Sequence, residues 1–158
     1  MEATRHFYED LIGMPLVATW CESDELFGKE RVYCHCFFGL ADSSALAFFQ
    51  FANREFSDQF AAPPPPSLFR HVALLVSTDS QEAIRDRAQA AGVETMTADH
   101  GYCKSLYITD PNGLLLEFTV DHPQVDEIDA VRRTSAHNDL ARWLSGDHSS
   151  NNDWRPDS

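Results

Sequence analysis

Two stretches decide the fold: RHVALLV at residues 70–76 and SLYITDPNGLLLEF at residues 105–118. The second contains the turn Asp110–Gly113, with proline at its second position and glycine at its fourth, which is the chemistry of a type I turn between paired strands. Residues 81–91, QEAIRDRAQAA, have a helical apolar face, and a short strand is expected at 93–96. This region is therefore predicted to be β-α-β-β-β.

The N-terminal part repeats most of this order. EATRHFYEDLI, residues 2–12, is predicted to be a helix that ends at Gly13. Strands are expected at residues 14–20, 32–40 and 45–51. The order α-β-β-β is that of the later region without its opening strand, which indicates an internal duplication.

Local signals set the boundaries between these parts. Ser23–Glu25 is predicted to be a polar loop, and Asp79, with Glu82 three residues later, is the expected N-cap of the second helix. Pro63–Pro66 cannot lie in a helix interior or a central strand, so it marks a linker. We predict a single domain at residues 1–120, whose halves, 1–60 and 67–120, are joined by a linker at 62–66. A C-terminal extension at 121–158 is expected to contain a helix at 125–145 and a polar, mobile tail.

Composition excludes several classes of partner. The 158 residues include 25 acidic and 12 basic side chains, for a net charge of -13 and a pI near 4.7. A field of that sign repels phosphate backbones and anionic lipid surfaces, so neither nucleic acid nor a membrane is expected as a partner. The N-terminus has no signal-peptide pattern, and the four cysteines form no CxxC pair. We expect reduced thiols and a cytoplasmic protein.

Two residues stand out as candidates for chemistry. His71 lies in the opening strand of the second half, and Glu117 lies in its closing strand among apolar neighbours. Burying a carboxylate there costs several kcal/mol, in order-of-magnitude terms, unless it is paired or binds a cation. The alternative is that Glu117 faces solvent at alternate strand positions and that His71 is a satisfied core histidine.

Together with the DPNG turn, these residues resemble the second module of the vicinal oxygen chelate superfamily, the glyoxalase, bleomycin-resistance and extradiol-dioxygenase group. FYEDLIGMPLV, residues 7–17, is similar to the helix and second strand of its first module. The resemblance covers about residues 5–120. It implies an α+β fold of paired βαβββ modules that form a curved, partly open mixed sheet around a cavity, here with the first strand of module 1 missing and an extra C-terminal helix.

The resemblance also implies a divalent metal held by His71 and Glu117. A further histidine would lie on the missing strand, so we expect either that a natural chain begins upstream of Met1 or that a partner subunit supplies this ligand. Glyoxalase I-like members carry a second glutamate where this chain has Ala47 or Phe48, which counts against a lactoylglutathione lyase. Two histidines and one carboxylate suit Fe(II), although Mn, Zn, Ni or Co can occupy such a site.

The same resemblance assigns catalytic roles to Tyr107 and His100. Tyr107 stands ten residues before Glu117, where extradiol dioxygenases hydrogen-bond a metal-bound catecholate; the alternative is an aromatic residue packed on the core. His100 precedes this strand and is expected to orient substrate or act as an acid or base, unless it is a solvated loop histidine. His35 faces either the cavity or the first helix. The other histidines are expected at the surface: His6, His122, His137 and His148.

The predicted function is a metal-dependent oxidoreductase of extradiol-dioxygenase type. Its small-molecule substrate would be aromatic or apolar, in a cavity walled by Phe37, Phe48 and Phe49. One alternative is a glyoxalase-like lyase or isomerase that uses the same metal, and another is a metal-free ligand-binding protein of bleomycin-resistance type. The resemblance also implies a homodimer.

Overall fold

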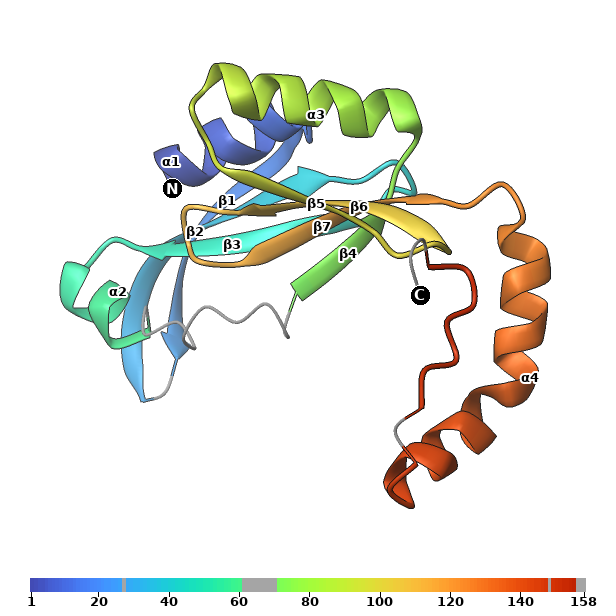
Figure 1. Cartoon of the computed structure of the whole chain (residues 1–158). Helices are drawn as coiled ribbons and strands as arrows, with labels where there is room; N and C mark the ends of the chain where they lie inside the picture. The colour runs from blue at the N-terminus through green and yellow to red at the C-terminus, as the bar shows by residue number, and fades with distance from the viewer. Residues whose placement is uncertain (27, 61–70, 148, 156–158) are drawn as a thin grey trace.

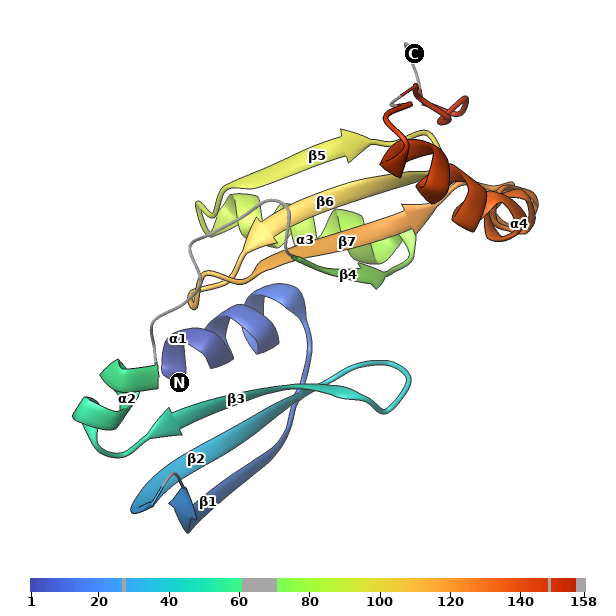
Figure 2. The ribbon, with the colours of Figure 1, turned by 90° about the horizontal axis from the view of Figure 1, so that it is seen from below.

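The computed structural model describes residues 1–26, 28–60, 71–147 and 149–155. Its strands form two sheets, one from each half of the chain, and a helix from each half lies over the same side of this pair of sheets (Figure 1). From the opposite side the sheets lie next to each other, with the N-terminal helix visible between their inner strands (Figure 2). The α+β class predicted from the sequence is confirmed.

The N-terminal half begins with a helix, which is followed by a three-stranded antiparallel sheet. The elements are α1 (Glu2–Arg5), the π-helical segment η1 (His6–Ile12), β1 (Leu16–Leu26), β2 (Lys29–Gly39) and β3 (Ala45–Phe51), with strand order β1-β2-β3. The helix ends at Gly13, whose φ of 91° lies in the left-handed region that glycine favours. A further short helix that the sequence did not predict, α2 (Arg54–Phe60), follows β3.

The polar loop expected at Ser23–Glu25 is wrong, because these residues continue β1. They pair in register with Val32, Arg31 and Glu30 of β2. Cross-strand hydrogen bonds join the two strands here: Tyr33 Oη donates to Asp24 Oδ2 at 2.6 Å, and Ser23 Oγ donates to Glu30 Oε1 at 2.9 Å. Such pairs stabilise a hairpin whose residues have low strand propensity on their own.

The second half is the predicted β-α-β-β-β unit. Its elements are β4 (His71–Leu75), α3 (Thr78–Ala90), β5 (Thr95–Asp99), β6 (Cys103–Thr109) and β7 (Leu115–Asp121), in the sheet order β4-β7-β6-β5. β4 runs parallel to β7, and the other neighbours are antiparallel. The expected cap Asp79 is wrong: Ser77, in an extended conformation, accepts a hydrogen bond from the Ser80 backbone N–H. The proline-rich linker lies outside the described residues, and the predicted domain boundaries stay a prediction.

The three strands of the first sheet correspond to three of the four strands of the second. The β2–β3 hairpin closes at the pair Gly39–Ala45, and the β6–β7 hairpin closes in the same way at Thr109–Leu115. β1, β2 and β3 therefore match β5, β6 and β7. Among the described residues no strand lies beside β3 in the position that β4 takes beside β7.

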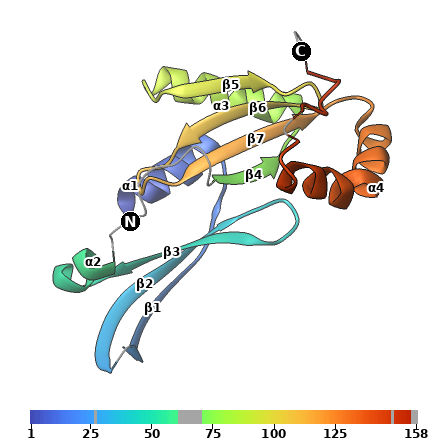
Figure 3. The same ribbon diagram turned by 60° about the horizontal axis from the view of Figure 1, so that its bottom comes forward.

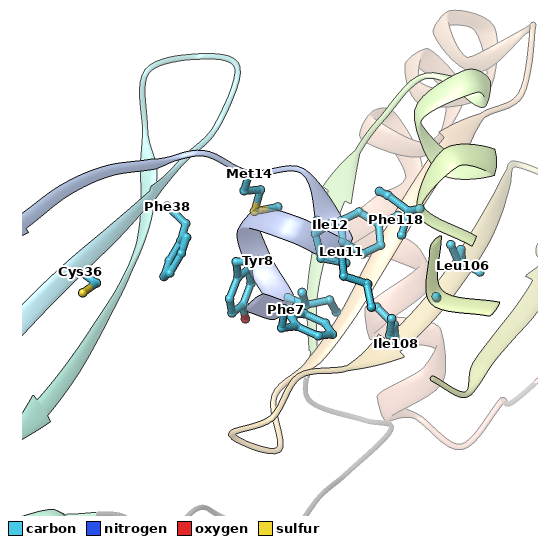
Figure 4. Close-up of a cluster of buried hydrophobic side chains, with 13 residues drawn as sticks. Phe7, Tyr8, Leu11, Ile12, Met14, Cys36, Phe38, Leu106, Ile108 and Phe118 are labelled. Carbon is cyan, nitrogen blue, oxygen red and sulfur yellow. The ribbon is translucent and has the colours of Figure 1, made fainter. Parts of the chain in front are cut away.

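The hydrophobic core is centred on the N-terminal helix. In Figure 4 Tyr8 points toward Phe38 of the first sheet, whereas Leu11 points toward Ile108 of the second. Phe48 also packs on this side of the first sheet, with its ring centroid 4.8 Å from that of Tyr8. The expectation that Phe48 walls the ligand cavity is therefore wrong, because residues 47 and 48 alternate across the sheet.

A polar contact ties this helix to the β6–β7 turn. The buried Tyr8 hydroxyl donates to Asp110 Oδ2 at 2.9 Å, and Asp110 Oδ1 accepts from the backbone N–H of Asn112 and Leu114 at 2.8 and 2.7 Å. Burial and the neighbouring Asp110 carboxylate raise the pKa of Tyr8. The turn recognised in the sequence thus also joins the two halves of the chain.

The C-terminal extension begins with α4 (Val125–Leu144), which projects away from the sheets (Figures 1 and 3). Residues 149–155 then return toward the loop between β5 and β6. No helix in the described part of the chain is both long enough and apolar enough to cross a membrane.

Candidate metal and ligand site

The parallel pairing of β4 and β7 brings His71 and Glu117 together. His71 pairs in register with Leu115, and Ala73 pairs with Glu117, so the two residues lie two register positions apart on neighbouring strands and on the same face of the sheet. His71 Nε2 lies 2.7 Å from Glu117 Oε2. The Glu117 side chain is only 8% exposed, whereas that of His71 is 29% exposed. Glu117 is therefore a buried, paired carboxylate, and the alternative of a solvent-facing strand residue does not hold.

The second oxygen of this carboxylate accepts two hydrogen bonds from β6. Ser105 Oγ donates to Glu117 Oε1 at 2.5 Å and Tyr107 Oη donates to the same atom at 2.8 Å. Burial raises the pKa of Glu117, but the two hydroxyl donors and the nearby His71 outweigh it, so the pKa lies below its ordinary value. The carboxyl group is therefore an anion at neutral pH.

His100 extends this network through Tyr107. Its Nε2 lies 3.0 Å from the Tyr107 hydroxyl oxygen. A tyrosine hydroxyl has a single proton, and the Glu117 anion can only accept. Tyr107 therefore donates to Glu117, and His100 donates its Nε2–H to Tyr107. Burial and the hydrogen bond to Glu117 raise the pKa of Tyr107, which keeps this phenol protonated near neutral pH.

The donor atoms fit a divalent metal in part. An imidazole nitrogen and a carboxylate oxygen converge at His71 and Glu117, and both donor types suit Fe, Mn, Co, Ni and Zn. The described residues contain no group of three or more His, Cys, Asp or Glu side chains placed to hold an ion. His71 and Glu117 would give such an ion two donors from the second sheet, and a third would have to come from outside this set.

The matching face of the first sheet is apolar. By hairpin register Phe37 occupies the position of Tyr107, and Ala47 that of Glu117, so Ala47 rather than Phe48 stands where a second glutamate would lie. His35 faces this side, away from the N-terminal helix, and its ring stacks on Phe49 with centroids 3.7 Å apart. Trp20 pairs in register with His35 across β1 and β2 and is 60% exposed.

Sequence reasoning found four of the five interacting residues and missed Ser105. The overlooked signal was strand alternation, because Ser105 and Tyr107 are two residues apart and share a face of β6. His6 is exposed, as predicted. His122, also expected at the surface, is partly buried, and its ring lies 5.2 Å from that of Trp154.

Comparison with known proteins identifies the superfamily of this chain. The profile of the Glyoxalase/Bleomycin resistance protein/Dioxygenase superfamily matches residues 1–118. The chain belongs to this superfamily. A search of curated protein sequences gave no match.

Solved structures of superfamily proteins share the fold. The fosfomycin resistance protein FosX from Listeria monocytogenes has a TM-score of 0.55 at 14% identity, covering 79% of this chain and 87% of FosX. A glyoxylase/bleomycin resistance protein/dioxygenase domain from Frankia sp. EAN1pec has a TM-score of 0.57 at 12% identity, covering 78% and 84%. A FosX structure with Mn(II) and sulfate has a TM-score of 0.51 at 15% identity, covering 80% and 87%, so one relative binds a divalent metal. At these identities the likeness establishes the fold alone.

Proposed function

We propose that this superfamily member is a metal-dependent enzyme that binds a small substrate through two vicinal oxygens, and that it is an oxidoreductase of extradiol-dioxygenase type. The observation that carries the proposal is the convergence of His71 Nε2 and Glu117 Oε2, with Tyr107 hydrogen-bonded to the same carboxylate. A buried carboxylate, an imidazole and a phenol donor within one network are three of the groups that this chemistry uses.

His71 and Glu117 would hold the metal, with Fe(II) favoured and Mn, Zn, Ni or Co as alternatives. A bound divalent cation acts as a Lewis acid and as a template that orients two substrate oxygens. Ser105 supports Glu117 by donating to the oxygen that does not face His71. This hydrogen bond restrains the orientation of the Glu117 carboxylate. Hydrogen bonds to metal-binding carboxylates have the same effect in metal sites generally.

Tyr107 and His100 would act on the substrate. The raised pKa of Tyr107 keeps its hydroxyl protonated, so the phenol could exchange its hydrogen bond to Glu117 for one to a developing substrate oxyanion. His100 donates to the Tyr107 oxygen and so fixes the direction of the phenol proton. If the phenol gives its proton up, His100 is the group placed to stabilise the phenolate.

The first sheet supplies the reason to expect an apolar or aromatic substrate. Phe37 and Phe49 lie on its open face, and Phe49 is 55% exposed. Exposed aromatic rings grouped on one face are typical of ligand or partner surfaces.

We infer further that the enzyme works in the cytoplasm as a homodimer.

A metal-free ligand-binding protein is the second candidate. The observation in its favour is that the described residues supply two metal donors and an exposed aromatic face. Such a protein would bind its ligand through Phe49 and Trp20 and would not need His71. It would therefore keep its ligand affinity in the His71→Ala variant.

The first experiment is to measure metal content per chain after anaerobic reconstitution with Fe(II) or Mn(II). We expect near-stoichiometric metal in the wild type and its loss in His71→Ala. The control variant His137→Ala, which changes an exposed histidine on α4, should keep the metal. Catechols with dioxygen are then screened by oxygen consumption. No metal in the wild type would reject the enzyme proposal for this chain and favour the binding protein.

A further inference from the structure

The C-terminal segment 149–155 lies against the loop that carries His100. Asn152 Nδ2 donates to the backbone oxygen of His100 at 2.9 Å. The ring of Trp154 packs beside that of His122, and Arg132 of α4 donates to the backbone oxygen of Asn151. The tail that the sequence predicted to be mobile is therefore held at three points.

Gly101 shows how closely the tail and the loop match. A Cβ atom built on Gly101 would lie 2.0 Å from the backbone oxygen of Trp154, a distance that real Cβ contacts do not show. The collision is with backbone atoms, so no side-chain rotation relieves it. The glycine next to His100 thus leaves the space that residue 154 occupies.

The same loop aims His100 at the candidate site. The His100 backbone N–H donates to Cys103 at 2.9 Å, and the Gly101 N–H donates to Asp99 Oδ1 at 2.8 Å. Within this closed loop the His100 side chain reaches Tyr107, which in turn donates to Glu117. A continuous set of contacts runs from the tail through the loop to the buried carboxylate.

We propose that the C-terminal tail is a positioning element of the site and that Asn152 is the positioning residue, because its hydrogen bond to the His100 backbone fixes the loop from which His100 reaches Tyr107. The consequence for catalysis depends on the proposed function. The positioning itself does not, because it concerns contacts within this chain only. Asn152 touches neither the metal donors nor the substrate face.

Two pairs of variants test the proposal. Asn152→Asp keeps the size of the side chain but replaces the N–H donor with an oxygen that faces a carbonyl. Its control is Asn151→Ala, which keeps the backbone oxygen that accepts a hydrogen bond from Arg132. Gly101→Ala displaces the tail and also strains the backbone, because the φ of residue 101 is 81°. Its control is Gly92→Ala, which strains a similar φ of 68° but has nothing within 4 Å of the added carbon, so it displaces no other segment.

The readout is the tautomer of His100, followed by long-range proton–nitrogen NMR of the full chain, with amide exchange at residues 99–103. We expect the Nε2–H form in the wild type and in both controls. In Asn152→Asp and Gly101→Ala the two tautomers average, and amide protection in the loop falls about fivefold, as for the loss of one hydrogen bond. Unchanged His100 signals in folded Asn152→Asp would overturn the proposal.

These measurements need neither metal nor substrate, so they separate the inference from the proposed function. If the wild type does not turn over catechols, the function fails and the NMR result still decides the positioning role. If it does, kcat in Asn152→Asp should fall about tenfold with KM unchanged, since Asn152 does not contact substrate. An unchanged kcat in that variant would contradict a positioning role in catalysis.

Discussion

The two sheets share one hairpin geometry but differ in chemistry. At matching positions the second sheet has Tyr107 and Glu117, and the first has Phe37 and Ala47. The second sheet buries a carboxylate with three hydrogen-bonding partners, whereas the first exposes aromatic rings. Of these two matching hairpin units, one therefore holds the polar groups and the other presents an apolar face.

This division shows that position in the fold does not decide function by itself. His35 occupies the register position of Ser105, yet it stacks on Phe49, while Ser105 donates to a carboxylate. The neighbours across the strands determine what each side chain does. Four predictions test how far the contrast between the sheets extends.

The largest effect is expected for metal binding. His71→Ala should lower the affinity for Fe(II) or Mn(II) about 100-fold or more, because one of two converging donors is lost. His35→Ala, in the first sheet, should leave the affinity unchanged. Titration calorimetry under anaerobic conditions measures both. Equal losses in the two variants would mean that the first sheet also contributes a donor, and the contrast would fail.

The next effect concerns the contact that joins the halves. Tyr8→Phe removes the buried hydrogen bond to Asp110 and should lower the free energy of unfolding by about 2 kcal/mol, as for a bond to a carboxylate. Tyr33→Phe removes a hydrogen bond to the exposed Asp24, and we expect a smaller loss, because water can replace a bond at the surface. Urea denaturation compares the two variants. A Tyr33 effect as large as that of Tyr8 would place the decisive contact within the first sheet.

A smaller effect follows from the lowered pKa of Glu117. Because the folded pKa lies below the ordinary value of 4.5, the ionised carboxylate stabilises the fold above that pH, and this stabilisation is lost as the pH falls through the folded pKa. The wild type should therefore lose stability below pH 4.5 relative to Glu117→Gln, which has no such titration. Thermal unfolding from pH 3 to 7 measures the difference. Parallel curves would show that the carboxylate is not stabilised as an anion.

The smallest effect on stability is expected at the exposed aromatic face. Phe49→Ala removes a ring that is 55% exposed, so the free energy of unfolding should change by about 1 kcal/mol or less. The same change should weaken binding of an aromatic ligand, followed through quenching of tryptophan fluorescence. Exposed Val131→Ala on α4 serves as the control. A ligand that binds both variants equally would contact a different surface.

Local patterns in the sequence determined most of the second half. The DPNG turn, the apolar runs on either side and the helix between them fix β4, α3, β6 and β7, because each depends on residues close in the chain. His71 and Glu117 stood out in these strand patterns, whereas Tyr107 and His100 were assigned through the resemblance to the superfamily; the structure brings all four into one network. Their chemical roles remain proposals.

Only the tertiary structure decided the features that depend on distant neighbours. Cross-strand pairing extended β1 through Ser23–Glu25, and packing against Tyr8 turned Phe48 toward the core. The contact of Asn152 with His100 spans 52 positions, and no periodicity reports a pair so far apart. The sequence by itself specified the hairpins and the polar residues, because these are local. Strand register and long-range packing determined which side chains meet, because contact energies between distant segments arise only when the chain is folded.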